Sequence, residues 1–277
     1  MIAIVNYGVG NLFSLSSSLR AIGQEVTITS NPEDLKKSER IILPGVGAFG
    51  DAARKLFESG LAAPLIEEAK AGKKILGICV GMQLLFSKSY EFGEHEGLNL
   101  IPGEVRYIGE VIPAGLKIPQ IGWNDLRLMA SIGKETPLES NPPVSKLLRS
   151  TPKALSPFTQ GAYDSANQAS PWGGGQRPEG VVFQKKDFFS NNPHHRKRSP
   201  SPEGGSDCFE NIIPNGEYVY FVHSYAAFCD EKYITSTTNY GADLTASVQN
   251  KNIYGVQFHP EKSGKAGLKI LKNFCEV

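Results

Sequence analysis

The sequence has no long hydrophobic run and no excess of charge of either sign. It has 29 Lys and Arg against 28 Asp and Glu in 277 residues, a formal net charge of +1. This balance provides no basic surface for nucleic acid or anionic lipid. No apolar run approaches the roughly 20 residues that cross a bilayer, and no basic segment opens the chain as in a secretory signal. We therefore expect a cytoplasmic protein with no nucleic-acid or membrane partner.

Cysteine is also scarce, and no two cysteines are spaced as a C-x-x-C pair. The four are Cys79, Cys208, Cys229 and Cys275. Their scatter indicates neither a zinc site nor a disulfide framework. Because 40% of the residues are hydrophobic, the chain can still build a proper core, so we expect a globular fold.

Short apolar strands alternate with helical segments in the first 80 residues. The pattern predicts strands at 2–5, 25–29 and 40–43 and just before Cys79, with helices at 12–22, 54–59 and 64–71. Strands separated by helices are typical of a parallel sheet covered by helices on both faces. The fold class is therefore predicted to be α/β, with an open, mostly parallel sheet.

The pattern changes after residue 104, where strands follow one another without helices between them. We expect strands at 104–108, 121–128, 217–227, 233–238, 245–249 and 253–258, and a closing helix at 265–274. Such a run predicts an antiparallel extension joined to the parallel sheet.

One long segment, 130–207, does not fit the α/β pattern. It contains 10 Pro, 11 Ser and 8 Gly and ends in a basic run with Ser-Pro pairs. A segment of this composition buries too little apolar surface to offset the entropy lost on ordering. We predict a single domain over 1–277, interrupted by a disordered insertion at 130–207.

A possible nucleophile lies where an apolar strand meets a Gly-x-Cys-x-Gly turn. Gly77 and Gly81 flank Cys79, and helix-forming residues follow. The two glycines allow a sharp turn that exposes the side chain between them. A thiol at a helix N-terminus is also favoured as the thiolate. The alternative is a buried structural thiol, as most free cysteines are.

A glycine-rich loop, 45–50, follows the predicted strand at 40–43. This position is the carboxyl end of a strand, the edge at which α/β sheets bind ligands. Its glycines let backbone N–H groups point at a developing oxyanion. An ordinary glycine-rich connection is the alternative.

A candidate base stands at the end of the last predicted strand. His259 is followed by Pro260 and Glu261, and a carboxylate just past a rigid proline can fold back to orient the imidazole. His223 is the rival base. It also lies in an apolar strand, but no acidic residue follows it closely.

Three strings in this order resemble the class I (triad) glutamine amidotransferases: Pro44–Gly47, Gly77–Gln83 and Phe258–Glu261. Finer strings are similar to the glutaminase subunits of imidazole glycerol phosphate synthase, of histidine biosynthesis: Gly122–Asn124, Phe221–Tyr225 and Glu261–Gly264. The resemblance covers essentially the whole chain outside the insertion and implies a flavodoxin-like sheet. The chain departs from the family pattern at Asn6, where Asp is common, and in the insertion.

The resemblance implies hydrolysis of L-glutamine to glutamate and ammonia. Cys79 would form the glutamyl thioester, His259 would act as the base, and Glu261 would orient it. Backbone amides of Gly45, Val46, Gly47 and Val80 would form the oxyanion hole. The residues nearest the glutamine backbone groups would be Gln83, Ser224 and Tyr225.

The resemblance also implies a partner, a (β/α)₈-barrel cyclase, as a separate subunit or a fused domain, that uses the ammonia to convert PRFAR into imidazole glycerol phosphate and AICAR. The residues that fall at the family's interface are Asn11, Trp123, Tyr220 and Lys262. No metal and no organic cofactor is implied. Two alternatives stay open: a glutaminase serving another ammonia-using synthase, and a non-catalytic protein on the same scaffold.

Overall fold

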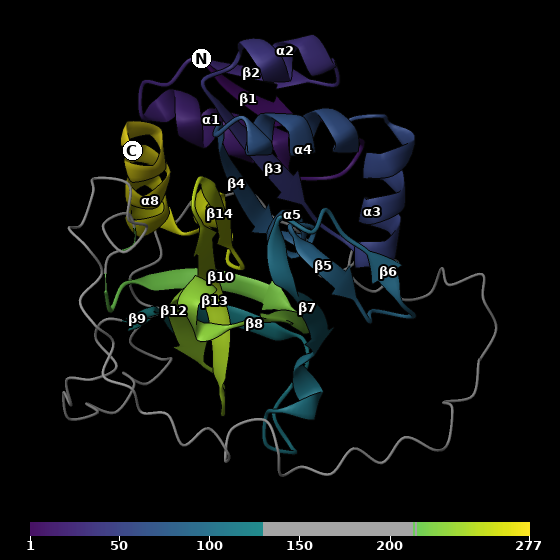
Figure 1. The fold of residues 1–277 in the computed structure, drawn as a ribbon. Helices are drawn as coiled ribbons and strands as arrows, with labels where there is room; N and C mark the ends of the chain where they lie inside the picture. The colour runs from purple at the N-terminus through teal and green to yellow at the C-terminus, as the bar shows by residue number, and fades with distance from the viewer. Residues whose placement is uncertain (130–212, 214) are drawn as a thin grey trace, which may run out of the picture. The chain divides into compact units, whose positions relative to one another are not determined.

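The computed structural model describes residues 1–129, 213 and 215–277, and its main feature is an eight-stranded sheet (Figure 1). The strand order is β2-β1-β3-β4-β14-β13-β12-β9. The whole of the predicted insertion, 130–207, lies outside the described residues, so its disorder remains a prediction.

The first five strands of this order are parallel to one another: β2 (Val26–Thr29), β1 (Ile2–Val5), β3 (Arg40–Gly45), β4 (Lys74–Cys79) and β14 (Ile253–Val256). The residues of β1 and β14 are buried throughout. Strands covered on both faces read as continuous apolar runs, which is why the sequence pattern identifies them. The α/β prediction with a mostly parallel sheet is confirmed.

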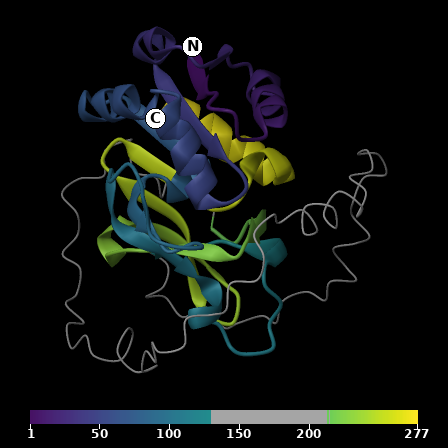
Figure 2. The same cartoon turned by 90° about the vertical axis from the view of Figure 1, so that its right-hand side faces the viewer.

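Helices cover both faces of this sheet, as Figure 2 shows. α1 (Leu12–Ala21) packs with α8 (Gly264–Glu276) on one face, and the other face carries α2 (Pro32–Lys37), α3 (Phe49–Glu58) and α4 (Ala62–Lys70). This division follows from right-handed crossovers between parallel strands. Within the described residues, no helix has both the length and the apolar character to cross a membrane.

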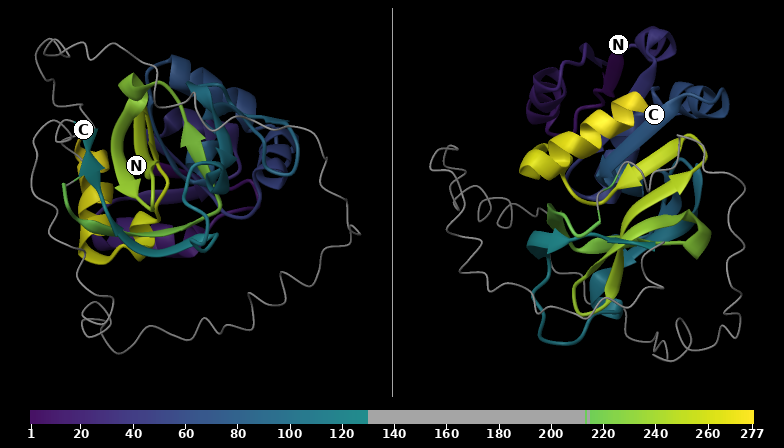
Figure 3. Two further views of the ribbon diagram at one scale, coloured as in Figure 1. Left: turned by 90° about the horizontal axis from the view of Figure 1, so that it is seen from below. Right: turned by 90° about the vertical axis from the view of Figure 1, so that its left-hand side faces the viewer.

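Antiparallel strands extend the sheet, but fewer of them join it than the sequence predicts. β13 (Asp243–Asn250), β12 (Ile234–Asn239) and β9 (Arg127–Leu128) complete the main sheet. The others form two smaller sheets, one of β10 (Tyr218–His223) with β8 (Gln120–Asp125), and one in the order β11 (Tyr225–Phe228), β7 (Ile101–Tyr107), β5 (Phe86–Ser89) and β6 (His95–Glu96). In the right-hand view of Figure 3 these teal and green strands lie below α8.

The predicted strand 217–227 is interrupted at Ser224. Its first part pairs with β8 and its second part with β7, so the chain changes sheet at this residue. In the part of the chain that the structure describes, short 3₁₀ turns lie at η1 (Ile108–Glu110), η4 (Glu231–Tyr233) and η5 (Pro260–Lys262). The predicted strand 253–258 ends at Val256, before the histidine.

The helix after Cys79 is shorter than its sequence indicates. α5 (Val80–Gln83) has a single turn, and the apolar run that follows enters β5, where Phe86 pairs with Ile101. Periodicity does not distinguish helix from strand in a short run that is apolar throughout, and here the pairing of β5 with β7 decides. α2 was missed although Asn31 caps it and Pro32 opens it, which is a local helix signal.

Candidate active site

Cys79 ends β4 and precedes α5, in a backbone conformation that few side chains adopt. Its φ is 55° and its ψ is −115°. A Cβ on Gly81 would lie 1.9 Å from the carbonyl oxygen of Leu43, and one on Gly77 would lie 2.6 Å from that of Gly81. A side chain at either position would collide with neighbouring backbone atoms, so both positions require glycine. A strained residue held this firmly is typical of a functional site.

His259 and Glu261 form a buried pair next to this turn. Nδ1 of His259 lies 2.9 Å from Oε1 of Glu261, and both side chains are 3% exposed. Burial would lower the pKa of His259. Interaction with Cys79, through charge and a hydrogen bond, and the bond to Glu261 outweigh burial and raise this pKa to about 10. The imidazole thus contacts Cys79 while its Nδ1 is bound to Glu261.

The rival base, His223, has both ring nitrogens engaged elsewhere. Nδ1 lies 2.8 Å from the carbonyl oxygen of Tyr225, and Nε2 lies 2.9 Å from Oε1 of Gln120. Burial, which outweighs the bond to Tyr225, and the nearby charge of His259 together lower the pKa of His223 to about 4. A neutral ring that donates from Nδ1 accepts at Nε2, so we assign the Gln120 amide the reverse orientation, with its NH₂ group in place of Oε1 at this nitrogen. The same orientation pairs the Gln120 nitrogen, which is otherwise unbonded.

The glycine-rich loop begins directly beside Cys79, because Gly45 pairs with Cys79 across β3 and β4. Tyr7 anchors the loop by donating its hydroxyl to the carbonyl oxygen of Pro44 at 2.7 Å. Burial, and then the charge of Cys79, raise the pKa of Tyr7, so its hydroxyl keeps its proton. Sequence reasoning missed this anchor, because the contact joins residues 37 positions apart.

Gln83 lies in α5 and is almost fully buried. Its Nε2 donates to the carbonyl oxygen of Tyr225 at 3.1 Å and to Oε1 of Gln257 at 3.0 Å. Both amide hydrogens are therefore used, and the carbonyl oxygen is the one group of this side chain left for a ligand.

Tyr225 and Ser224 lie at the start of β11 and just before it. The Tyr225 ring packs at 5.6 Å from Tyr107 and at 6.3 Å from Phe92. Glu91, which sequence reasoning missed, precedes Phe92 in the chain, and its carboxylate, after burial, raises the pKa of Tyr225. Glu91 also accepts a hydrogen bond from the backbone N–H of Phe49, at the start of α3. An acidic residue between two aromatic residues was the available signal.

Three of the four predicted interface residues lie together. The rings of Trp123 and Tyr220 are 6.1 Å apart, and the Lys262 ammonium is 5.7 Å from the Tyr220 ring centre. The Trp123 side chain is 42% exposed. Asn11 instead caps α1, where its side chain accepts from the backbone N–H of Ser14.

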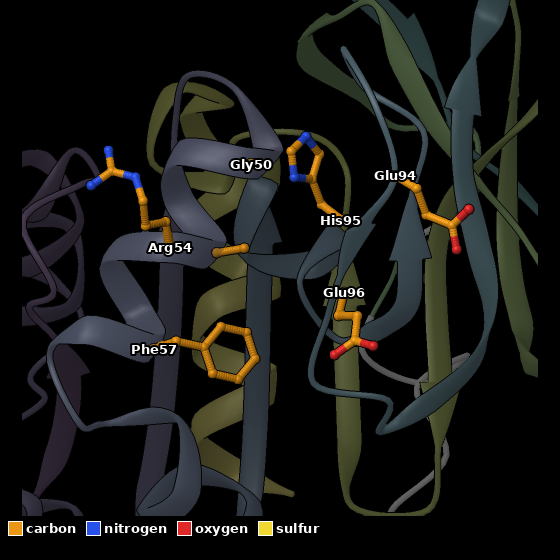
Figure 4. Close-up of a pocket in the computed structure, with 7 residues that line it drawn as sticks. Gly50, Arg54, Phe57, Glu94, His95 and Glu96 are labelled. Carbon is orange, nitrogen blue, oxygen red and sulfur yellow. The ribbon is translucent and has the colours of Figure 1, made fainter.

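A surface pocket of about 360 Å³ lies between α3 and the β6 strand, apart from these residues (Figure 4). It is lined by Gly50, Ala53, Arg54, Phe57, Glu94, His95 and Glu96. The His95 ring faces Gly50, where an added Cβ would lie 2.7 Å from it. None of the predicted site residues lines this pocket.

Comparison with known proteins identifies the family. Residues 3–277 match the glutamine amidotransferase class-I family. The imidazole glycerol phosphate synthase subunit HisH of Caldanaerobacter subterraneus subsp. tengcongensis is 37% identical over 278 residues, covering all of this chain and 98% of that protein. HisH of Wolinella succinogenes is 35% identical over 279 residues, covering both proteins fully.

Solved structures share the fold. A crystal structure of a glutamine amidotransferase superposes with a TM-score of 0.58 at 13% identity, over 100% of this chain and 98% of that one. The structure of PurLQS from Thermotoga maritima gives 0.55 at 18% identity, over 99% and 97%. The sequence matches are more specific than these fold matches. The chain belongs to the glutamine amidotransferase class-I family and, within it, to the HisH subunits of imidazole glycerol phosphate synthase.

Proposed function

We propose that this glutamine amidotransferase hydrolyses L-glutamine to glutamate and ammonia through a thioester on Cys79, and supplies the ammonia to a cyclase partner. The observation that carries the proposal is the buried His259–Glu261 pair, 2.9 Å apart, whose imidazole contacts the thiol at the strained turn. A nucleophile, a base and a group that orients the base are the parts that thiol catalysis needs.

The proton moves between Cys79 and His259. Because Nδ1 of His259 faces Glu261, Nε2 takes the thiol proton, and the resulting thiolate sulfur attacks the side-chain amide carbon of glutamine. Nε2 then gives this proton to the leaving ammonia as the C–N bond breaks. Water, deprotonated by the same nitrogen, hydrolyses the thioester and releases glutamate. His223 is unsuited to this role, since its pKa of about 4 and its two bonds keep it neutral and occupied.

The oxyanion formed on attack is stabilised by backbone N–H groups beside the sulfur. The candidates are those of Gly45, Val46, Gly47 and Val80, since Gly45 pairs with Cys79 and Val80 follows it. Donors fixed in a site that excludes water stabilise the developing charge more than water does.

The α-amino and α-carboxylate groups of glutamine are recognised around Gln83, Ser224 and Tyr225. Because both amide hydrogens of Gln83 are used, its oxygen accepts from the α-ammonium. Glu91 precedes Phe92, whose ring packs against Tyr225, and adds an acidic group for the same ammonium.

The cyclase docks on the surface that carries Trp123, Tyr220 and Lys262. An exposed aromatic pair beside a cation is typical of an interface centre. Asn11 and Phe13 lie at the start of α1, a helix that contacts the η5 turn carrying Lys262, and Phe13 is 81% exposed. The barrel partner would combine the ammonia with PRFAR to give imidazole glycerol phosphate and AICAR.

The test is glutamate release by the full chain, with and without the cyclase loaded with PRFAR or an analogue. We expect loading to raise the rate, and Cys79→Ala to lower the rate of the loaded complex by about a thousandfold or more. Equal activity of the wild type and Cys79→Ala would overturn the catalytic assignment.

The partner is tested separately, by pull-down with candidate synthases. Selection of the cyclase supports the histidine-pathway assignment, and preference for another ammonia-using synthase would replace it. A loaded wild-type complex that releases no glutamate would favour the non-catalytic scaffold.

A further inference from the structure

Gln257 lies fully buried between β14 and His259, and its side chain reaches the nucleophile. Its backbone N–H donates to the carbonyl oxygen of Ala246 at 2.9 Å, which fixes the main chain here. Its side-chain Nε2 lies 3.7 Å from Sγ of Cys79, within hydrogen-bonding range for sulfur. The thiol therefore has a second polar neighbour besides His259.

The orientation of the Gln257 amide is set by its other neighbour. Nε2 of Gln83 donates to Oε1 of Gln257 at 3.0 Å and also to the carbonyl oxygen of Tyr225. Turning the Gln257 amide over would place two NH₂ groups against each other, which leaves a buried donor unpaired. The NH₂ group of Gln257 consequently faces the sulfur.

We propose that Gln257 is a positioning residue that donates a hydrogen bond to the Cys79 sulfur and holds it as the thiolate. The proposal rests on the proposed role of Cys79 as the nucleophile. An ionised acceptor binds an N–H more strongly than a neutral one, so the bond favours the thiolate over the thiol. The effect is enhanced because both side chains are buried, where hydrogen bonds are electrostatically stronger than in water.

The chain of amides also limits the movement of the sulfur. Sγ is held between Nε2 of Gln257 and the imidazole of His259, so a proton lost to His259 leaves a thiolate that already has a donor. The donor does not exchange a proton with the sulfur. Its contribution is to orientation and to the charge balance of the ion pair.

The experiment measures how fast iodoacetamide alkylates Cys79 in the full chain between pH 5 and 9.5, with the alkylated site identified by mass spectrometry. Gln257→Leu removes the donor at similar side-chain volume. We expect the midpoint of its rate–pH curve to rise by about one pH unit, and alkylation at pH 7 to fall about tenfold. The turnover number of the loaded complex should fall by a similar factor.

Two further variants separate this role from damage to the fold. Gln257→Glu keeps the shape and the bond from Gln83 but turns an oxygen toward the sulfur, so its midpoint should rise further than that of Gln257→Leu. Gln249→Leu makes the same substitution on β13, where the side chain donates to the carbonyl oxygen of Lys251, and should leave the curve unchanged.

The two proposals fail in different ways. Identical alkylation curves for the wild type and a folded Gln257→Leu or Gln257→Glu would overturn the role of Gln257, whatever the activity. A Cys79→Ala complex as active as the wild type would instead overturn the assignment of Cys79 as the nucleophile.

Discussion

His223 is the residue whose burial most directly opposes its protonation. Its ring joins Gln120 on β8 to the Tyr225 carbonyl, which also accepts from Gln83. Burial, the largest influence, holds its pKa near 4. A histidine that is neutral when folded and binds a proton more readily when unfolded loses its stabilising effect as the pH falls. That effect is fully present above about pH 6.5 and disappears between 6.5 and 4.

We predict that acidification destabilises the wild type more than it destabilises His223→Gln, which has no proton to bind at this position. Between pH 7.5 and 5 the difference in unfolding free energy should change by about 2 kcal/mol. Urea unfolding at the two pH values measures it. His259, whose pKa is raised to about 10, stays protonated over this range in the folded protein and is present in both proteins, so the comparison isolates His223. Parallel losses of stability in the two proteins would show that His223 is not buried as a neutral ring.

The turn between β4 and α5 depends on packing between elements. Gly81 lies against the backbone of β3, where a Cβ would meet the Leu43 carbonyl oxygen at 1.9 Å. Gly47, in the neighbouring loop, has open space around it, and only its φ of 86° disfavours a side chain. These glycines are thus required for different reasons.

Alanine substitution should separate the two cases. Gly81→Ala must push β3 away from α5, and we predict a loss of about 3 kcal/mol or more. Gly47→Ala should cost about 1 kcal/mol, the usual penalty for a left-handed backbone. Thermal or urea unfolding of both variants measures this, and equal losses would rule out the backbone contact as the reason for Gly81.

On the scale of the whole molecule, the segments on either side of the predicted insertion meet. The backbone N–H of Leu128 donates to the Asn215 side chain at 3.1 Å, and that of Gly216 donates to the Leu126 carbonyl oxygen at 2.8 Å. From there β8 and β10 pair, beginning at Asp125 and Tyr218. A short connection between these two segments can therefore replace the long insertion.

We predict that replacing 130–207 by a short glycine-containing linker leaves the fold and the partner-dependent glutaminase activity largely intact. Loop length changes closure entropy only slowly, and the flanking hydrogen bonds stay in place. The melting temperature and the rate of glutamate release measure the outcome. An insoluble deletion product would show that the segment packs on the core and that the single-domain description is incomplete.

The sequence by itself determined what local patterns encode. Apolar runs predicted the parallel strands, the glycines around Cys79 predicted the turn, and the order of motifs predicted the family. Only the tertiary structure decided which long-range partners those residues have. It places His259 against Cys79 and gives the ring nitrogens of His223 other hydrogen-bond partners. It also begins α3 at Phe49, whose backbone N–H donates to the Glu91 carboxylate. The reason is physical: periodicity and turn chemistry act over a few residues, whereas these contacts join positions 42 to 180 residues apart, which pairing between strands brings together.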